Sequence, residues 1–290
     1  MADDRIDEGF FSARDGVRLF YRTERAAAPA GHVALVHGYA DHLGRYVEIT
    51  RALTSAGYTV HLIDCRGHGQ SGGKRAHVDA FKDYLSDLEL FLARVKEQAA
   101  KAPLFLLGHS HGALISARYL LNQPEAVRGV VLCSPYFKLK MHVPPLKILA
   151  GKLVGRVLPG LPMSNALKPE LLTRDVRIQE ATRTDPLYLH VATPRWFNES
   201  TAAQETVLRR ATEFVTPFLL LLGTADGIAD PAAGRDFFEH ATSKDKQLKQ
   251  YEGLVHELFH EPERDAVFRD VVGWLDERAR GASARAAGTR

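Results

Sequence analysis

The sequence predicts an α/β fold in which a mostly parallel sheet is covered by helices. Apolar runs of strand length alternate with longer stretches of helical period over much of the 290-residue chain. Many of these runs are nearly continuous in Val, Leu and Ile, which indicates strands buried on both faces. The alternation fails once, in a stretch rich in Pro and Gly that begins near residue 136. We therefore expect an α/β core with an inserted cap.

The individual elements follow from these patterns. Strands are predicted at 32–38, 58–64, 103–109, 127–134, 217–223 and 246–252. Helices are predicted where apolar residues recur three and four positions apart, at 78–98, 111–123 and 264–279. Alternating residues on both sides of Asp15-Gly16 predict an antiparallel hairpin at the sheet edge.

These elements divide the chain into three parts. Residues 1–135 and 213–280 form the predicted core, 136–212 the predicted helical cap or lid, and 281–290 a small, basic, disordered tail. One helical face in the cap is predicted to be apolar, and its residues are Leu146, Leu149, Ala150, Leu153, Val154, Val157 and Leu158. That helix either packs on the core or forms a mobile lid that lines an acyl tunnel or touches lipid.

Composition is that of an ordinary soluble globular protein, with 45% hydrophobic and 25% charged residues. A net charge of +3 gives no broad footprint for nucleic acid, although it permits mild attraction to an anionic surface. The acidic N-terminus lacks the features of a secretory signal, so we expect a cytoplasmic protein, with the inner membrane surface as a peripheral site. Cys65 and Cys133 end apolar runs and are expected to be reduced core residues.

The segment LFLLGHSHGALISARYLL carries the strongest functional signal. Residues 108–112 match G-x-S-x-G between a predicted buried strand and a predicted helix. In this context Ser110 sits in a strained turn with its hydroxyl exposed, and side chains at 108 or 112 would collide with the neighbouring strand and helix. Ser110 is therefore the candidate nucleophile, and a tight turn with an idle serine is the alternative.

A serine nucleophile needs a histidine base that is oriented by a carboxylate, in the chain order serine, acid, histidine. Asp226 lies in the loop after the next buried strand. Asp230 precedes Pro231 and is explained as a helix N-cap, so Asp226 is the candidate acid. His256 follows the last predicted strand and is the candidate base, with His260 as the alternative.

Two other patterns resemble binding motifs. His256–His260 fits the zinc-binding pattern H-E-x-x-H, but Gly253 lies close before it and Pro262 disfavours helix at its end. No familiar third-ligand pattern follows, so no metal is expected. Gly67–Gly72 fits G-x-G-x-x-G, yet the predicted helix begins several residues later, which favours a glycine turn over a dinucleotide site.

Ester hydrolysis also needs hydrogen-bond donors for the developing oxyanion. The candidates are two backbone N–H groups, that of His111 after the nucleophile and that of Tyr39 in the loop after the first buried strand. The bulky, polar side chains of both residues are expected at the site entrance.

Five segments carry a family resemblance: HGYADHLGRY, DCRGHGQSGG, GHSHG, GTADGIAD and YEGLVHELFHEPER. In this order and spacing they resemble the monoacylglycerol lipases and lysophospholipase-like members of the α/β-hydrolase fold. The resemblance covers about residues 10–278 and implies the same roles for Ser110, Asp226 and His256. The polar residues that it implies near the glycerol end of the substrate are Asp41, His42 and Arg45.

We therefore expect a serine ester hydrolase that cleaves acyl esters, above all monoacylglycerols, through an acyl-enzyme and without metal or cofactor. The expected partner is a small lipid or ester substrate, with no nucleic acid and no obligate protein partner. Alternatives are a lysophospholipase, a short-chain esterase, a non-catalytic receptor, and an S33-like aminopeptidase. The acids that would bind the amine in an aminopeptidase are Glu170, Asp175 and Glu180.

Overall fold

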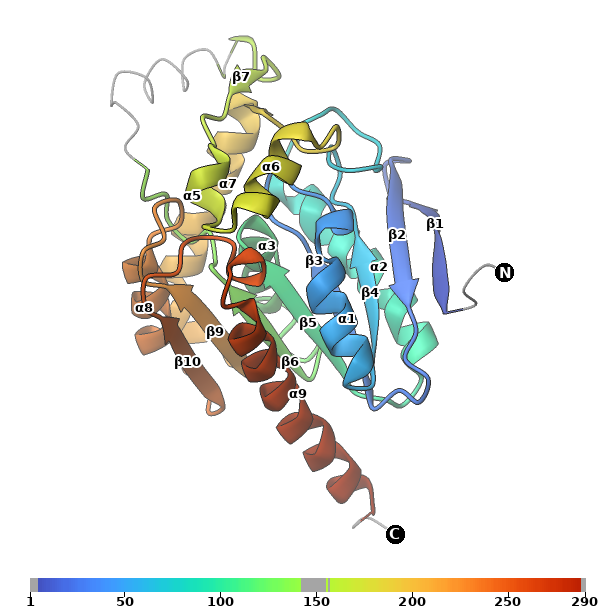
Figure 1. The fold of residues 1–290 in the computed structure, drawn as a ribbon. Helices are drawn as coiled ribbons and strands as arrows, with labels where there is room; N and C mark the ends of the chain where they lie inside the picture. Colours follow the sequence, from blue (N-terminus) through green and yellow to red (C-terminus); the bar gives the residue numbers. More distant parts are fainter. Residues whose placement is uncertain (1–4, 142–154, 156, 288–290) are drawn as a thin grey trace.

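A twisted eight-stranded sheet forms the centre of the computed structural model, which describes residues 5–141, 155 and 157–287 (Figure 1). Its strand order is β1-β2-β4-β3-β5-β6-β9-β10. The strands are β1 (Ile6–Ser12), β2 (Arg18–Glu24), β3 (Gly31–Val36), β4 (Tyr58–Ile63), β5 (Leu104–His109), β6 (Gly129–Cys133), β9 (Phe218–Gly223) and β10 (Lys246–Tyr251). All six runs predicted as strands are strands of this sheet.

Pairing in the sheet is parallel from β4 to β10 and antiparallel at the β1 end. The turn between β1 and β2 contains Gly16, whose φ of 83° explains the glycine there. Strands β3, β4, β5, β6 and β9 are buried along their whole length because helices cover both faces. The prediction of a mostly parallel sheet with an edge hairpin is confirmed.

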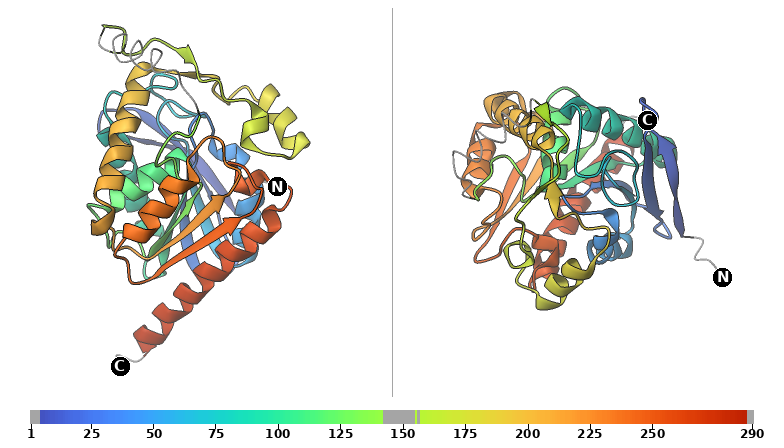
Figure 2. Two further views of the ribbon diagram at one scale, coloured as in Figure 1. Left: turned by 90° about the vertical axis from the view of Figure 1, so that its left-hand side faces the viewer. Right: turned by 90° about the horizontal axis from the view of Figure 1, so that it is seen from above.

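Helices form one layer on each face of the sheet, as Figure 2 shows. On one face lie α1 (Val47–Ser55) and α9 (Arg264–Ala287), which share a core with side chains from that side of the strands. On the other face lie α2 (Phe81–Ala99), α3 (His111–Leu120), α7 (Pro194–Arg209) and α8 (Pro231–His240). Short 3-10 turns are η1 (Leu43–Arg45), η2 (Ala211–Glu213) and η3 (Leu258–His260).

The region predicted as a cap lies above the carboxyl ends of the strands (Figure 1). Its described elements before α7 are β7 (Met163–Ser164), α5 (Pro169–Leu172), α6 (Val176–Thr184) and β8 (Val191–Ala192). Helix α7 packs against α2 and α3 in the main body. Of the predicted apolar cap face, Leu146 to Val154 lie outside the described residues, whereas Val157 and Leu158 are 78% and 55% exposed.

The end of the chain differs from the prediction of a disordered tail. Helix α9 continues to Ala287, so residues 281–287 are helical. The physical reason is helix propensity. Ala and Arg favour helix, and the cost of the single glycine in this segment is too small to end it. In the described part of the chain, no helix combines the length and apolar character needed to cross a bilayer.

Candidate active site

Ser110 occupies a sharp turn between β5 and α3. Its backbone has φ 52° and ψ −113°, a strained conformation for a residue with a side chain. The flanking glycines are required by space: a Cβ at Gly108 would lie 2.6 Å from the Cα of Ala113, and one at Gly112 would lie 2.2 Å from the carbonyl oxygen of Val36. The collisions predicted from the sequence are therefore present, and they fix Ser110 at the carboxyl end of β5.

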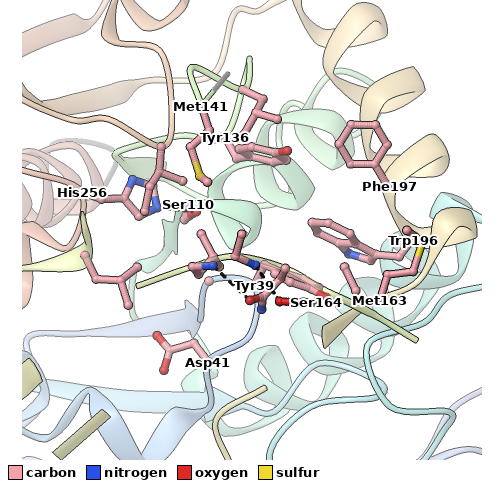
Figure 3. A pocket seen from close by; sticks show the side chains of 18 of the residues that line it. Tyr39, Asp41, Ser110, Tyr136, Met141, Met163, Ser164, Trp196, Phe197 and His256 are labelled. Atoms are coloured by element: carbon pink, nitrogen blue, oxygen red, sulfur yellow. Dashed lines mark hydrogen bonds between the residues drawn. The ribbon is translucent and has the colours of Figure 1, made fainter. Parts of the chain in front are cut away.

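The structure brings Ser110, His256 and Asp226 together in one hydrogen-bonded chain. The Ser110 Oγ lies 2.8 Å from His256 Nε2, and His256 Nδ1 lies 2.7 Å from Asp226 Oδ2. All three residues are buried, and Figure 3 shows the Ser110 and His256 side chains facing one another. Because an ionised carboxylate only accepts, His256 Nδ1 donates to Asp226 and Nε2 is left to accept from the serine hydroxyl.

Asp226 is held by its own loop, which follows β9. One carboxylate oxygen, Oδ1, accepts the N–H groups of Ile228 at 2.8 Å and Ala229 at 3.0 Å. This leaves Oδ2 for His256. Asp230 instead accepts the N–H of Ala232 at 3.0 Å and caps α8, as the sequence predicts.

His256 lies in the loop after β10, and its environment favours the protonated ring. Burial alone would lower the pKa of His256. The carboxylate of Asp226, and beyond it those of Glu257 and Asp41, outweigh this effect and raise the pKa above its ordinary value. The residues of the H-E-x-x-H pattern do not share one α-helix, because only Leu258–His260 are helical, in η3. His260 Nδ1 lies 2.7 Å from Glu257, whereas His256 Nδ1 lies beside Asp226. The two imidazoles therefore have different partners.

The two predicted oxyanion donors lie at the ends of β3 and β5. Within the described part of the chain, neither the Tyr39 N–H nor the His111 N–H donates to a protein acceptor. The Gly38 N–H, in contrast, donates to the Tyr46 hydroxyl at 3.1 Å. The amides at Tyr39 and His111 are therefore available to a ligand.

The side chains of Tyr39 and His111 face different surroundings. Tyr39 stacks on Trp196 of α7, with ring centroids 3.6 Å apart, and donates its hydroxyl to the Val191 carbonyl. His111 lies 3.1 Å from the Ser200 Oγ through Nε2 and is buried between α2 and α7. The expectation that both side chains sit at the site entrance is wrong for His111, because α7 covers it.

The glycine turn at Gly67–Gly72 supports the loop that carries Tyr39. Asp64 accepts the N–H of Leu43 through Oδ1 and that of Gln70 through Oδ2, both at 2.7 Å. A Cβ at Gly69, whose φ is 48°, would lie 2.1 Å from the Asp64 carboxylate. The pattern is thus a turn built around a buried aspartate.

Of the three residues implied near a glycerol group, only Asp41 lines the cavity beside Ser110. His42 Nε2 donates to Asp185 at 2.8 Å. Arg45 donates to Asp41 at 3.2 Å and to both oxygens of Glu257, at 3.1 and 2.9 Å. Partners from distant segments hold His42 and Arg45 away from the described cavity wall.

The cavity beside Ser110 has a volume of about 240 Å³ and a mainly apolar wall. Figure 3 shows aromatic and methionine side chains around it. The aromatic and methionine residues among the lining are Tyr39, Tyr136, Met141, Met163, Trp196 and Phe197. Such a wall fits an acyl chain.

The region predicted as a cap is joined to both loops that carry the base and the acid. Next to the acid, Leu139 forms an isolated antiparallel bridge with Ala229, and Lys140 Nζ donates to the Asp226 carbonyl at 2.8 Å. Next to the base, the Glu257 N–H donates to the Leu172 carbonyl at 2.7 Å. The Thr173 hydroxyl donates to the carbonyl of His260, also at 2.7 Å.

Sequence and structure comparisons relate the chain to known enzymes. Residues 27–263 match the family described as "Serine aminopeptidase, S33". The monoacylglycerol lipase of Mycolicibacterium smegmatis is 31% identical, over 95% of this chain and 99% of the relative. The crystal structure of the Paleococcus ferrophilus monoacylglycerol lipase superposes with a TM-score of 0.82 at 32% identity, over 90% of this chain and 99% of that one.

The chain belongs to the monoacylglycerol lipase family of α/β-hydrolases. The chain is also similar to a relative with another name: phospholipase YtpA of Bacillus subtilis is 29% identical over 88% of this chain and 98% of its own length. The resemblance inferred from the five sequence segments is confirmed.

Several residues that line this site could not be identified from local sequence patterns. Trp196 reaches the cavity from α7, and Tyr136 from the segment after β6. Glu257 also lines the cavity, but in the sequence it is only the second position of an apparent zinc motif. Its pairing with Arg45 joins positions 212 apart in the chain, which no local pattern predicts.

Proposed function

We propose that this protein hydrolyses the ester bond of monoacylglycerols through a Ser110–His256–Asp226 triad. The observation that carries the proposal is the buried hydrogen-bonded chain from Asp226 to Ser110, which ends at the wall of an apolar cavity. The family relationship supports ester hydrolysis by a serine enzyme.

The geometry suits a two-step reaction. Ser110 Oγ attacks the acyl carbonyl while its proton passes to His256 Nε2, and the N–H groups of Tyr39 and His111 bind the oxyanion. The glycerol oxygen then leaves with the proton from His256, and the acyl group remains on Ser110. Water, deprotonated by His256, attacks the acyl-enzyme, and the fatty acid is released. Asp226 keeps the imidazole in the required tautomer throughout.

The charges around the cavity favour an uncharged alcohol as leaving group. Asp41 and Glu257 are the carboxylates on the described wall, and Arg45 pairs with both. The described lining residues include these two carboxylates and no lysine or arginine. This supports a monoacylglycerol over a lysophospholipid.

The three acids that the sequence offered for an aminopeptidase do not line the described cavity. Glu170 and Glu180 are exposed and pair with Arg183, and Asp175 caps α6 and pairs with Arg177. None of the three is among the residues that line the described cavity. The position of these acids therefore does not support binding of a free amine.

Contact with a lipid surface is part of the proposal. Val157, Leu158 and Leu161 are exposed just before Met163, which lines the cavity. Exposed apolar side chains beside the cavity would assist transfer of a lipid substrate from a membrane.

Substrate competition tests the proposal. Hydrolysis is measured in EDTA for a long-chain monoacylglycerol, the lysophosphatidylcholine with the same acyl chain, a short nitrophenyl ester and an aminoacyl nitroanilide. We expect the highest kcat/KM for the monoacylglycerol and a loss of about 10⁴-fold or more in Ser110→Ala.

The other outcomes assign the alternatives. A higher kcat/KM for lysophosphatidylcholine would identify a lysophospholipase, and one for the nitroanilide an aminopeptidase. Fast cleavage of the short ester alone would identify a short-chain esterase. Failure of the wild type both to cleave any substrate and to react with a fluorophosphonate probe would indicate a receptor.

Activity should fall in acid with a midpoint above pH 6.5. His256 accepts the serine proton only when unprotonated, and its pKa is raised above 6.5 by Asp226 and the neighbouring carboxylates. The pH profile of kcat/KM for a soluble ester measures this midpoint. A midpoint well below 6.5 would contradict the assignment of His256 as the base.

A further inference from the structure

Four ionisable side chains form a buried cluster beside the base loop. Asp41, Arg45, Glu257 and His260 have side chains that are at most 9% exposed. Arg45 bridges the two carboxylates, and His260 contacts Glu257 from the other side. A buried cluster of this kind is stable only when its charges are paired and its polar atoms are satisfied.

Both ring nitrogens of His260 face acceptors. Nδ1 lies 2.7 Å from Glu257 Oε2, and Nε2 lies 2.8 Å from the backbone carbonyl oxygen of Arg45. A carbonyl oxygen only accepts hydrogen bonds, so Nε2 must carry a proton.

The other acceptor, Glu257, is a carboxylate anion. Burial alone would raise the pKa of Glu257, but the guanidinium of Arg45 and the ring of His260 hold it well below its usual range. The two hydrogen bonds from Arg45, one to each oxygen, fit the ionised form. Glu257 therefore also only accepts, and Nδ1 of His260 must donate to it.

We infer that His260 is an imidazolium cation and a positioning residue for the base His256. With His260 charged, the cluster holds two anions and two cations; with a neutral ring, one buried negative charge would be unpaired. Glu257 directly follows His256 in the chain, and His260 holds this carboxylate from one side while Arg45 holds it from the other.

Ionisable groups on several elements surround the His260 ring, and they link it to the base His256. Asp41 and Arg45 face it from the loop after β3, Glu257 from the base loop, and the Tyr46 ring lies 5.9 Å away. Tyr46 also lies 2.8 Å from His109 Nδ1, at the end of β5. Since Asp41 and Glu257 both raise the pKa of His256, a cation bound to Glu257 offsets part of their effect.

The pH profile of His260→Gln tests the charge, and this test rests on the proposed hydrolase activity. Glutamine keeps a hydrogen-bond donor but removes the cation, which leaves the cluster with a net negative charge. We expect the acid midpoint of kcat/KM to move upward by about half a unit to one unit of pH. His240→Gln, in which a 57% exposed histidine at the end of α8 is replaced, should leave the midpoint unchanged. A lower kcat in His260→Gln with an unmoved midpoint would overturn the inference, because a neutral His260 has no charge to lose.

A second measurement is independent of activity and of how the variant folds. In the wild-type protein with ¹⁵N-labelled histidine, the His260 ring is assigned through its NOEs to Tyr46. At neutral pH we expect two ring N–H signals and nitrogen shifts of an imidazolium. A single N–H with the shifts of a neutral tautomer would refute a charged His260, whatever the enzyme hydrolyses.

Discussion

Replacement of Asp226 by asparagine is expected to lower kcat for ester hydrolysis by about 10⁴-fold without unfolding the protein. The two N–H groups at Ile228 and Ala229 select the amide oxygen for their position, so the amide nitrogen is directed at His256 Nδ1. Nδ1 must then accept, and the ring proton moves to Nε2, where it faces the Ser110 hydroxyl. The histidine is present but in the tautomer that cannot take the serine proton. Steady-state kinetics on a soluble ester, with thermal unfolding as a check on the fold, measure the effect.

Asp230→Asn is the matched control. Asp230 lies four residues away in the same loop region and caps α8 through the N–H of Ala232. Asparagine is an equally good N-cap, so stability and kcat should both stay close to wild type. Equal losses in the two variants would mean that the loop, and not the carboxylate of Asp226, is what the reaction needs.

Gly112→Ala is expected to have the largest effect on stability, a loss of several kcal/mol or failure to fold. The new Cβ would lie 2.2 Å from the Val36 oxygen and 2.5 Å from that of His37, both backbone atoms of the strand end beside α3. Backbone at the centre of the sheet has no room to move, so α3 would be displaced together with Ser110. The free energy of unfolding in denaturant is the measurement.

Gly273→Ala makes the same chemical change but is expected to raise the stability of the protein. Gly273 lies in α9, and apart from its chain neighbours and the backbone of its own helix, nothing lies within 4 Å of an added Cβ. Because alanine favours helix over glycine, this variant should be more stable by up to about 1 kcal/mol. A neutral Gly112→Ala beside a stabilised Gly273→Ala would refute the tight packing of α3 on β3.

The sequence was sufficient for the features that depend on local pattern. Buried parallel strands appear as continuous Val and Leu runs, and the serine turn leaves a trace because two glycines are needed at fixed positions around Ser110. Asp226 and His256 follow strands of known order, so their convergence at one sheet edge was predictable. Because Asp230 directly precedes Pro231, it could be recognised as a helix N-cap, which left Asp226 as the candidate acid.

Contacts between distant segments were not predictable in this way. The family resemblance placed the side chains of His42 and Arg45 near the substrate, but Asp185 and Glu257, from distant segments, bind them. The stacking of Trp196 on Tyr39 likewise depends on how α7 lies over the loop after β3. The predicted tail rested on its small, basic and aperiodic composition, which did not show that helix α9 runs on past Gly281 to Ala287.

The attachments of the inserted region to the acid and base loops limit how this enzyme can diversify. Lys140 holds the acid loop, and Leu172 and Thr173 hold the base loop, so both ends of the segment between them are tied to the reacting groups. Exchange of segments between relatives, in evolution or in the laboratory, would keep the chemistry intact only if the crossover points fall inside these attachments. Met141, Met163 and Leu167 lie between these attachments and line the cavity, so changes at these residues can alter substrate preference while the attachments to the reacting groups stay in place.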